Sequence, residues 1–197
     1  MKFRFLSIFS FIILILFSNC QTPHPSELSA KESSEKTLQL QYAEELETKV
    51  LKVGPTQEIT IGQLALKSFS NTSSRLFSIH SVSPVKTNAP VLPGAIVLRK
   101  VQVDRSLEFE EGTTRFHHAT FASIVEFLVV NSAGEEQRIL GHSEQITSQT
   151  IPFSAEDTES KEKIAITIQS AVEEGLTQIA SLKGFSRILK SQNMFQR

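Results

Sequence analysis

The chain has 197 residues, with 20 basic and 21 acidic residues and a formal net charge of −1. A chain so close to neutral does not attract nucleic acid by bulk electrostatics, so we expect no nucleic-acid partner. It contains a single cysteine, Cys20, which excludes an internal disulfide and leaves the hydrophobic core to hold the fold.

The N-terminal segment has the pattern of an export signal. Its first four residues carry two positive charges, and residues 5–17 are apolar apart from two serines. This apolar run is shorter than the roughly 20 residues that a membrane-spanning helix needs. An ordinary signal-peptidase site requires small residues, and Phe17 does not fit that pattern, so cleavage directly before Cys20 is the better interpretation.

The stretch "LFSNC", residues 16–20, resembles the signal of bacterial lipoproteins, in which a cysteine is acylated on its sulfur and becomes the new N-terminus. The usual pattern in that family is Leu, Ala or Ser, Gly or Ala, then Cys. Phe17 replaces the usual Leu and Asn19 stands where Gly or Ala is usual, so the signal is similar to the looser spirochaetal type. The resemblance implies removal of residues 1–19 and lipidation of Cys20. The N-terminal acyl chains would then be the attachment to a membrane.

Residues 20–36 are expected to form the lipidated cysteine and a flexible tether. From Gln21 to Lys36 the chain has two prolines, four serines and charges of both signs, with little to bury. Gln21, rather than Asp, follows the cysteine, and by analogy with enterobacterial sorting this permits the outer membrane. We therefore expect a lipid-anchored protein of the cell envelope, in the outer membrane, with a single globular domain over residues 37–197.

The first half of this domain gives mixed signals. Residues 37–53 have apolar side chains every four positions, as on a helix face, but some of them also alternate as in a strand, and we favour the helix. Residues 58–66 and 76–85 are strand-like, with a polar turn at 70–75 between them. Residues 85–94 contain two prolines and are expected to form a loop or an edge connection.

The next segments predict an antiparallel β-meander, because apolar residues of one parity alternate with polar residues of the other. In chain order these are strand 97–109, turn 111–114, strand 119–129, turn 131–134 and a third, weaker strand over 136–151. The apolar residues of the first strand are Val97, Val101, Val103, Leu107 and Phe109. Arg105 shares their parity, and we expect it to reach solvent near a strand end.

Residues 156–183 have the 3.6-residue period of a long amphipathic helix. Ser154 and Asp157 form a candidate capping box, and Gly184 is a candidate C-terminal stop. Gly175 inside the helix costs about 1 kcal/mol, which indicates a close approach to the sheet. The fold class is therefore expected to be α+β, an antiparallel meander covered by a long C-terminal helix; the alternative is a β-sandwich with an appended helix.

Four histidines, His80, His117, His118 and His142, are the candidates for catalysis or metal binding. Adjacent residues on a strand point to opposite faces, so His117 and His118 cannot chelate one metal, and a zinc site would lack a second cysteine. The sequence has none of the hydrolase, metalloprotease or phosphate-loop motifs. We expect no metal, no cofactor and no catalysis, although an enzyme could still arise if these histidines met a carboxylate in one cleft.

Two groups of residues are candidates for binding. Phe121, Val125 and Phe127 would line a cavity between sheet and helix if the protein carried a lipidic or other small ligand. The basic residues Lys183, Arg187 and Lys190 would contact anionic headgroups, or else belong to a short final helix with solvated charges.

The order of anchor, polar tether, sheet and late helix resembles small envelope-assembly lipoproteins that assist lipopolysaccharide or cell-wall machinery. The stretch "LALKSFSNTSS", residues 64–74, is similar to the strand-then-Asn opening of some of them. The resemblance concerns architecture. It predicts a membrane-anchored accessory or assembly protein that acts by interaction with an envelope protein partner and is not an enzyme; the alternative is a binder or carrier of a small ligand.

Overall fold

The structure is a computed structural model, and it describes residues 38–53, 57–77, 79, 81–87, 89–109, 111–112, 116–149 and 157–182. The chain divides into two compact units, Met1–Glu35 and Lys36–Arg197, and every described residue belongs to the second. Its described elements are β1 (Gln39–Ala43), the 3-10 helix η2 (Glu44–Thr48), β2 (Leu51–Lys52), β3 (Glu58–Ile59), α2 (Ile61–Phe77), β4 (Val82–Val85), β5 (Ala95–Phe109), β6 (Phe116–Val130), β7 (Glu136–His142), β8 (Ile146–Ser148) and α3 (Glu159–Ser181).

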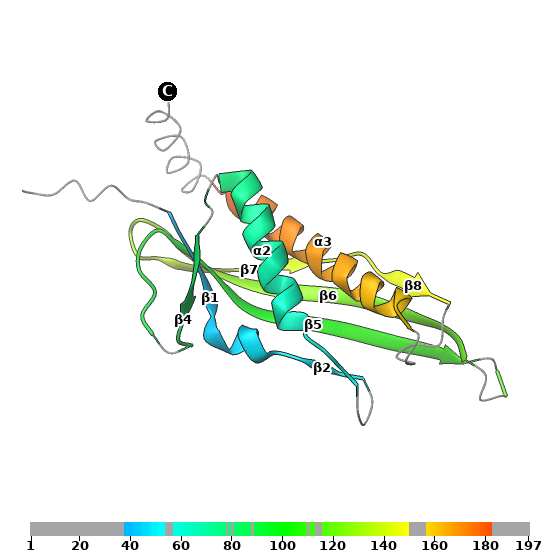
Figure 1. Ribbon diagram of the computed structural model, residues 1–197. Coiled ribbons are helices and arrows are strands. Elements are labelled where there is room, and N and C mark those ends of the chain that lie inside the picture. The colour runs from blue at the N-terminus through cyan, green and yellow to red at the C-terminus, as the bar shows by residue number, and fades with distance from the viewer. Residues whose placement is uncertain are drawn as a thin grey trace, which may run out of the picture. The chain divides into compact units, whose positions relative to one another are not determined.

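The main sheet has the strand order β4-β1-β5-β6-β7, with β8 paired to β6 beyond the end of β7. Strands β5, β6 and β7 form the predicted antiparallel meander, whereas β1 runs parallel to both of its neighbours. Helices α2 and α3 lie side by side over one face of this sheet (Figure 1). The predicted α+β class is confirmed, with a mostly antiparallel sheet that does not close on itself.

The helix favoured for residues 37–53 is wrong, because this segment forms β1, η2 and β2. Strand β1 pairs on one side with β4 and on the other with β5, where Leu40 lies between Val82 and Ile96. The backbone of β1 is therefore hydrogen-bonded on both sides. These hydrogen bonds stabilise the strand, and the four-residue period of its side chains does not predict them.

The strand predicted for 58–66 and the turn predicted for 70–75 are also wrong beyond Ile59, because α2 occupies Ile61–Phe77. Ala65 and Phe69 are fully buried at helical spacing. Weak helix formers fill the second half, where the Ser74 hydroxyl donates to the Asn71 carbonyl oxygen at 2.9 Å. Because of these residues, the sequence did not show a clear helical pattern. Of the strand predicted for residues 76–85, the structure contains only β4.

A β-bulge at Arg99 shifts the side chains of β5 between the faces of the sheet. Leu98 pairs with Phe127 and Lys100 with Glu126, so Arg99 is the extra residue. The parity predicted for Val97 is therefore wrong, since Val97 lies on the face opposite Val101.

The far end of the β5–β6 hairpin is less covered than its alternating pattern predicts. Leu107 is 37% and Phe109 55% exposed, although both were expected on the covered face. Arg105 is exposed there, as expected for a residue near a strand end. The third, weaker strand is divided into β7 and β8.

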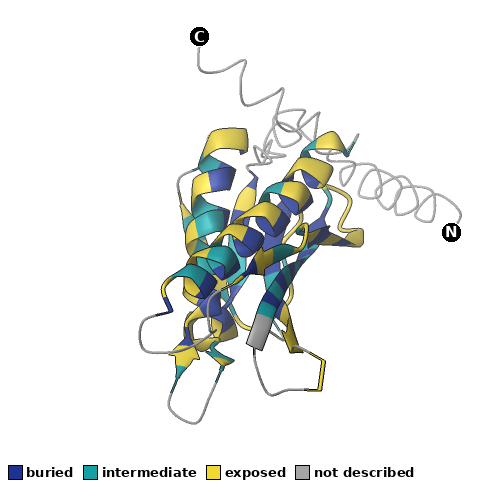
Figure 2. Ribbon diagram, turned by 90° about the vertical axis from the view of Figure 1, so that its right-hand side faces the viewer, coloured by how far each residue is buried: buried dark blue, intermediate teal, exposed yellow. Residues whose placement is uncertain are grey.

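The core lies between the sheet and the two helices (Figure 2). Phe69 of α2 and Phe127 of β6 are fully buried, and their ring centroids are 5.8 Å apart. Burying a side chain of this size contributes about 1.5–3 kcal/mol, so these two residues are main contacts between the layers.

The predicted C-terminal helix is confirmed as α3, and so is the close approach at Gly175. A Cβ at Gly175 would lie 2.5 Å from Phe127 Cε2, and a Cβ at Gly141 of β7 would lie 2.1 Å from the Ala171 carbonyl oxygen. At the start of α3, Asp157 accepts a hydrogen bond from the Ser160 N–H at 2.9 Å. The other capping residues expected from the sequence, Ser154 and Gly184, lie outside the described residues.

Replacing Gly175 by alanine is expected to lower the free energy of unfolding by about 1–3 kcal/mol. In a helix with free space at this position, the same change would raise the free energy of unfolding by about 1 kcal/mol, because alanine has the higher helix propensity. A decrease therefore indicates the contact with Phe127, and an increase indicates helix propensity alone. Urea unfolding followed by far-UV circular dichroism measures the difference. Ser170→Ala, at an exposed position of the same helix, is the control and should change stability by less than about 0.5 kcal/mol. A stabilised Gly175→Ala variant would contradict the packing described here.

The pKa of Tyr42 makes stability depend on pH. The Tyr42 hydroxyl donates to Glu47 Oε1 at 2.6 Å. This hydrogen bond, together with desolvation and the charges of Glu47 and Glu44, raises the pKa of Tyr42 above its ordinary value of 10.0. The raised pKa means that the folded state favours the neutral phenol of Tyr42. Its contribution to the free energy of unfolding is complete at pH values below the pKa of Tyr42 in the unfolded chain, and it is lost as pH rises through the pKa of Tyr42 in the folded protein.

Tyr42→Phe is therefore expected to flatten the decline of unfolding free energy above about pH 10. Urea unfolding at a series of alkaline pH values measures both proteins. Glu47→Gln should flatten the decline in the same direction, because it removes the charge that favours the neutral phenol. Identical pH profiles for all three proteins would refute the assignment.

Candidate functional site

An open groove of about 400 Å³ lies between α2 and α3. The residues that line it are Leu64, Lys67, Ser68, Asn71, Thr72 and Arg75 of α2, and Ala165, Gln169 and Glu173 of α3. All of them belong to the two helices, so the groove follows from how these helices pack together.

The α2 wall presents a polar stripe. Lys67, Asn71 and Arg75 follow one another at intervals of four residues, which places them on one face of the helix, and all three are exposed. Leu64 lies on the N-terminal side of these residues in α2 and is apolar and half-buried. The stripe therefore combines two positive charges with an amide between them.

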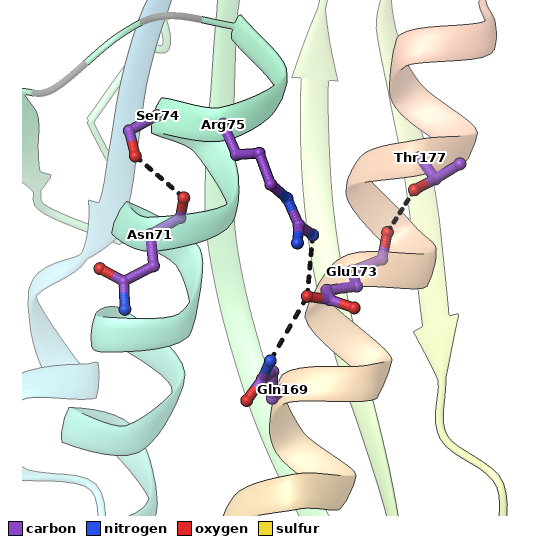
Figure 3. A network of polar contacts seen from close by, with 6 residues as sticks. All are labelled: Asn71, Ser74, Arg75, Gln169, Glu173 and Thr177. Atoms are coloured by element: carbon purple, nitrogen blue, oxygen red, sulfur yellow. Dashed lines mark hydrogen bonds and ion pairs between the residues drawn. The ribbon is translucent and has the colours of Figure 1, made fainter.

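The α3 wall carries the matching stripe of Ala165, Gln169 and Glu173. Arg75 Nη2 lies 2.8 Å from Glu173 Oε1 and joins the two walls at one end of the groove (Figure 3). Gln169 Nε2 donates to the same carboxylate oxygen at 3.4 Å, and the Thr177 hydroxyl donates to the Glu173 carbonyl oxygen at 2.7 Å. These contacts orient the side chains that face the groove.

The ion pair between the walls is a surface interaction. The side chains of Arg75 and Glu173 are 64% and 37% exposed. Such pairs contribute about 0–1 kcal/mol, because solvent and salt screen them. A binding partner could therefore separate them at small cost, which leaves Arg75 and Glu173 available for intermolecular contacts.

The chemistry of the groove suits hydrogen bonding to a polar or peptide surface. Ser68 and Thr72 supply hydroxyls, but none of the described lining residues is a histidine or cysteine, so neither hydroxyl has an imidazole base there. The amide, hydroxyl and charged groups of the lining can donate and accept hydrogen bonds with a peptide or with another protein surface.

The described histidines do not converge. His118 Nε2 lies 2.9 Å from Glu108 Oε2 across β5 and β6. His142 pairs with Ile124, six residues further along β6, which is about 20 Å away at the rise of a strand. His80 and the side chain of His117 lie outside the described residues. In the described part of the chain, no three His, Cys, Asp or Glu side chains gather as a metal site.

The residues predicted to line a ligand cavity, Phe121, Val125 and Phe127, are fully buried in the core and do not border the groove. Their ligand-lining role stays a prediction. Cys20 and the predicted headgroup contacts Lys183, Arg187 and Lys190 lie outside the described residues.

Sequence reasoning missed the groove because it assigned residues 58–66 to a strand and residues 70–75 to a turn. The signal that could have found it is the four-residue spacing of Lys67, Asn71 and Arg75 beside that of Ala65 and Phe69.

Within the described ranges, no helix combines the length and apolar character needed to cross a bilayer.

No family model matches the chain, and no curated protein does. Among solved structures, the chain is similar to rare lipoprotein B from Shewanella oneidensis, with 16% identity and a TM-score of 0.47, over 74% of this chain and 95% of that one. It is also similar to a minor lipoprotein from Acinetobacter baumannii, with 14% identity and a TM-score of 0.38, over 72% of this chain and 92% of that one. At these identities and TM-scores, neither similarity supports a conclusion about the family or the function of this chain.

Proposed function

We propose that this chain is a lipid-anchored accessory protein of the bacterial cell envelope that acts by interaction and is not an enzyme. The observation that carries the proposal is the position of Cys20, the only cysteine, directly after a charged start and a short apolar run. Residues 1–19 are then the signal, residues 20–36 the acylated cysteine and its tether, and residues 37–197 the domain.

The anchor determines where the domain works. Acyl chains contribute about 0.8 kcal/mol for each buried methylene, and two or more chains give lasting attachment. A flexible tether of about 16 residues has a root-mean-square reach of roughly 20 Å, so the domain stays near the bilayer. Gln21 after the cysteine permits the outer membrane, which is the location proposed, and Lys183, Arg187 and Lys190 are proposed to lie near anionic headgroups.

The groove between α2 and α3 is the surface proposed for an envelope protein partner. It is open, its walls carry charged and amide side chains, and the ion pair that joins them is exposed. A small-ligand carrier is the second candidate, since the volume of about 400 Å³ falls within the range of ligand pockets. The polar lining and open form favour the protein partner, because carriers of lipidic ligands enclose them among apolar side chains.

The lipid anchor is tested by intact mass and detergent partitioning of the full-length protein, expressed in a bacterium that processes lipoproteins. We expect an N-terminus at Cys20 with added acyl mass and partition into the detergent phase. Cys20→Ala should lose both, whereas the control Ser18→Ala should keep both, because alanine fits the lipoprotein pattern at that position. An unmodified Cys20 with the signal removed would refute the anchor and indicate an exported protein without lipid.

The groove is tested by site-specific photocrosslinking in intact cells. A benzophenone side chain at Lys67 should form an adduct with one envelope protein, because Lys67 lines the groove. The control position is Ser170, which is exposed on α3 outside the groove lining and should give no such adduct. Adducts at both positions, or at neither, would argue against this surface, and an adduct with lipid alone would favour the carrier.

A further inference from the structure

The groove between α2 and α3 follows both helices for two to three turns. Its α2 wall extends from Leu64 to Arg75, which is about 16 Å at the rise of a helix, and its α3 wall from Ala165 to Glu173, about 12 Å. An extended chain covers such a length with about four or five residues, at about 3.3 Å each. The groove therefore has the length of one short segment of a partner.

Lys67 is the charge in the groove that no described residue neutralises. Helix α2 has two charged residues, Lys67 and Arg75, and both are positive. Arg75 is already paired with Glu173 at 2.8 Å. Lys67 is exposed, and in the described part of the chain it takes part in no ion pair. The charge that the groove offers to a partner is therefore positive, and an acidic side chain complements it.

The α2 wall also offers hydrogen-bonding groups that have no partner among the described residues. These are the Ser68 hydroxyl and the side-chain amide of Asn71, which no dashed line reaches in Figure 3. A helical occupant satisfies its backbone internally, so it could use these groups only through its side chains. An extended occupant exposes N–H and C=O groups along its whole length, and the wall can bond them directly. The lining therefore favours an extended segment.

The end of the groove away from the ion pair is apolar. Leu64 and Ala165 line it and are half-buried, and Ile166, which follows Ala165, is 51% exposed. Leu64 and Lys67 are about 5 Å apart along the helix axis. Side chains two positions apart lie on the same face of an extended chain, about 6–7 Å from each other. An apolar residue two positions from an acidic one therefore matches Leu64 and Lys67.

We propose that this groove binds an extended segment of its partner that carries an acidic residue and, two positions away, an apolar residue. The acidic side chain pairs with Lys67, and the apolar one lies against Leu64 and Ala165. The backbone of the segment bonds Ser68 and Asn71, and basic segments are repelled. The inference rests on the proposed function, in which the groove faces an envelope protein partner.

The test uses full-length protein in detergent micelles and a fluorescently labelled peptide, TLTETLT, followed by fluorescence anisotropy. The peptide has the same order of side chains in both directions, so it can present an apolar residue beside the acidic one in either orientation. We expect saturable binding that is about tenfold tighter than that of TLTKTLT, because repulsion from Lys67 replaces attraction. Added salt should reduce the difference, since it screens exposed charges.

Variants of the protein locate the site. Lys67→Glu should reverse the preference between the two peptides. The matched control is Lys100→Glu, at an exposed lysine on the sheet face opposite the helices, and it should keep the preference. Asn71→Ala should weaken both peptides by about fivefold, because a hydrogen bond to the peptide backbone does not depend on the peptide's charge. All three positions are exposed, and far-UV circular dichroism checks that the variants fold.

Three outcomes would overturn the proposal. They are the absence of saturable binding, equal affinities that Lys67→Glu does not alter, and concentration-dependent dimerisation that Lys67→Glu abolishes, which would make the occupant a second copy of the chain. A crosslink at Lys67 in cells without peptide binding would refute the acidic segment and leave the groove as the partner surface. Charge-dependent peptide binding without any crosslink in cells would support the site and refute the proposed envelope partner.

Discussion

At Gly175 and Gly141, helix α3 approaches strands β6 and β7 with almost no side chain between them, and this contact fixes how close the helix layer comes to the sheet. Gly175 leaves room for the ring of Phe127, and Gly141 lets the strand backbone come up to the Ala171 carbonyl. The ring of Phe127 then meets Phe69 of α2 at a centroid distance of 5.8 Å. Phe127 therefore packs against both helices, and the groove lies between these helices.

The same approach makes the two sides of the sheet unequal. Because α3 crosses β7, Glu174 and Gln178 reach the backbone of that edge strand and occupy its hydrogen-bonding groups. At the far end of β5, residues 104–109 are exposed. The placement of the helix layer therefore protects the β7 edge, since an edge strand is protected where something covers or caps it.

The proposed anchor and the described domain contribute to function in different ways. The segment around Cys20 concerns where the protein is held, and it depends on chemistry that a short sequence pattern specifies. The domain offers a polar groove whose two walls are joined at one end by an exposed ion pair.

The sequence by itself determined the features that arise from neighbours along the chain. The meander strands, α3 and the close approach at Gly175 follow from local periodicity and from the size of one residue, and the structure confirms them. Tertiary structure alone decided that residues 39–43 form a strand, because β1 gains hydrogen bonds from β4 and β5, which lie far away in sequence. It also decided α2, whose serines and threonines conceal its period, and with α2 the groove.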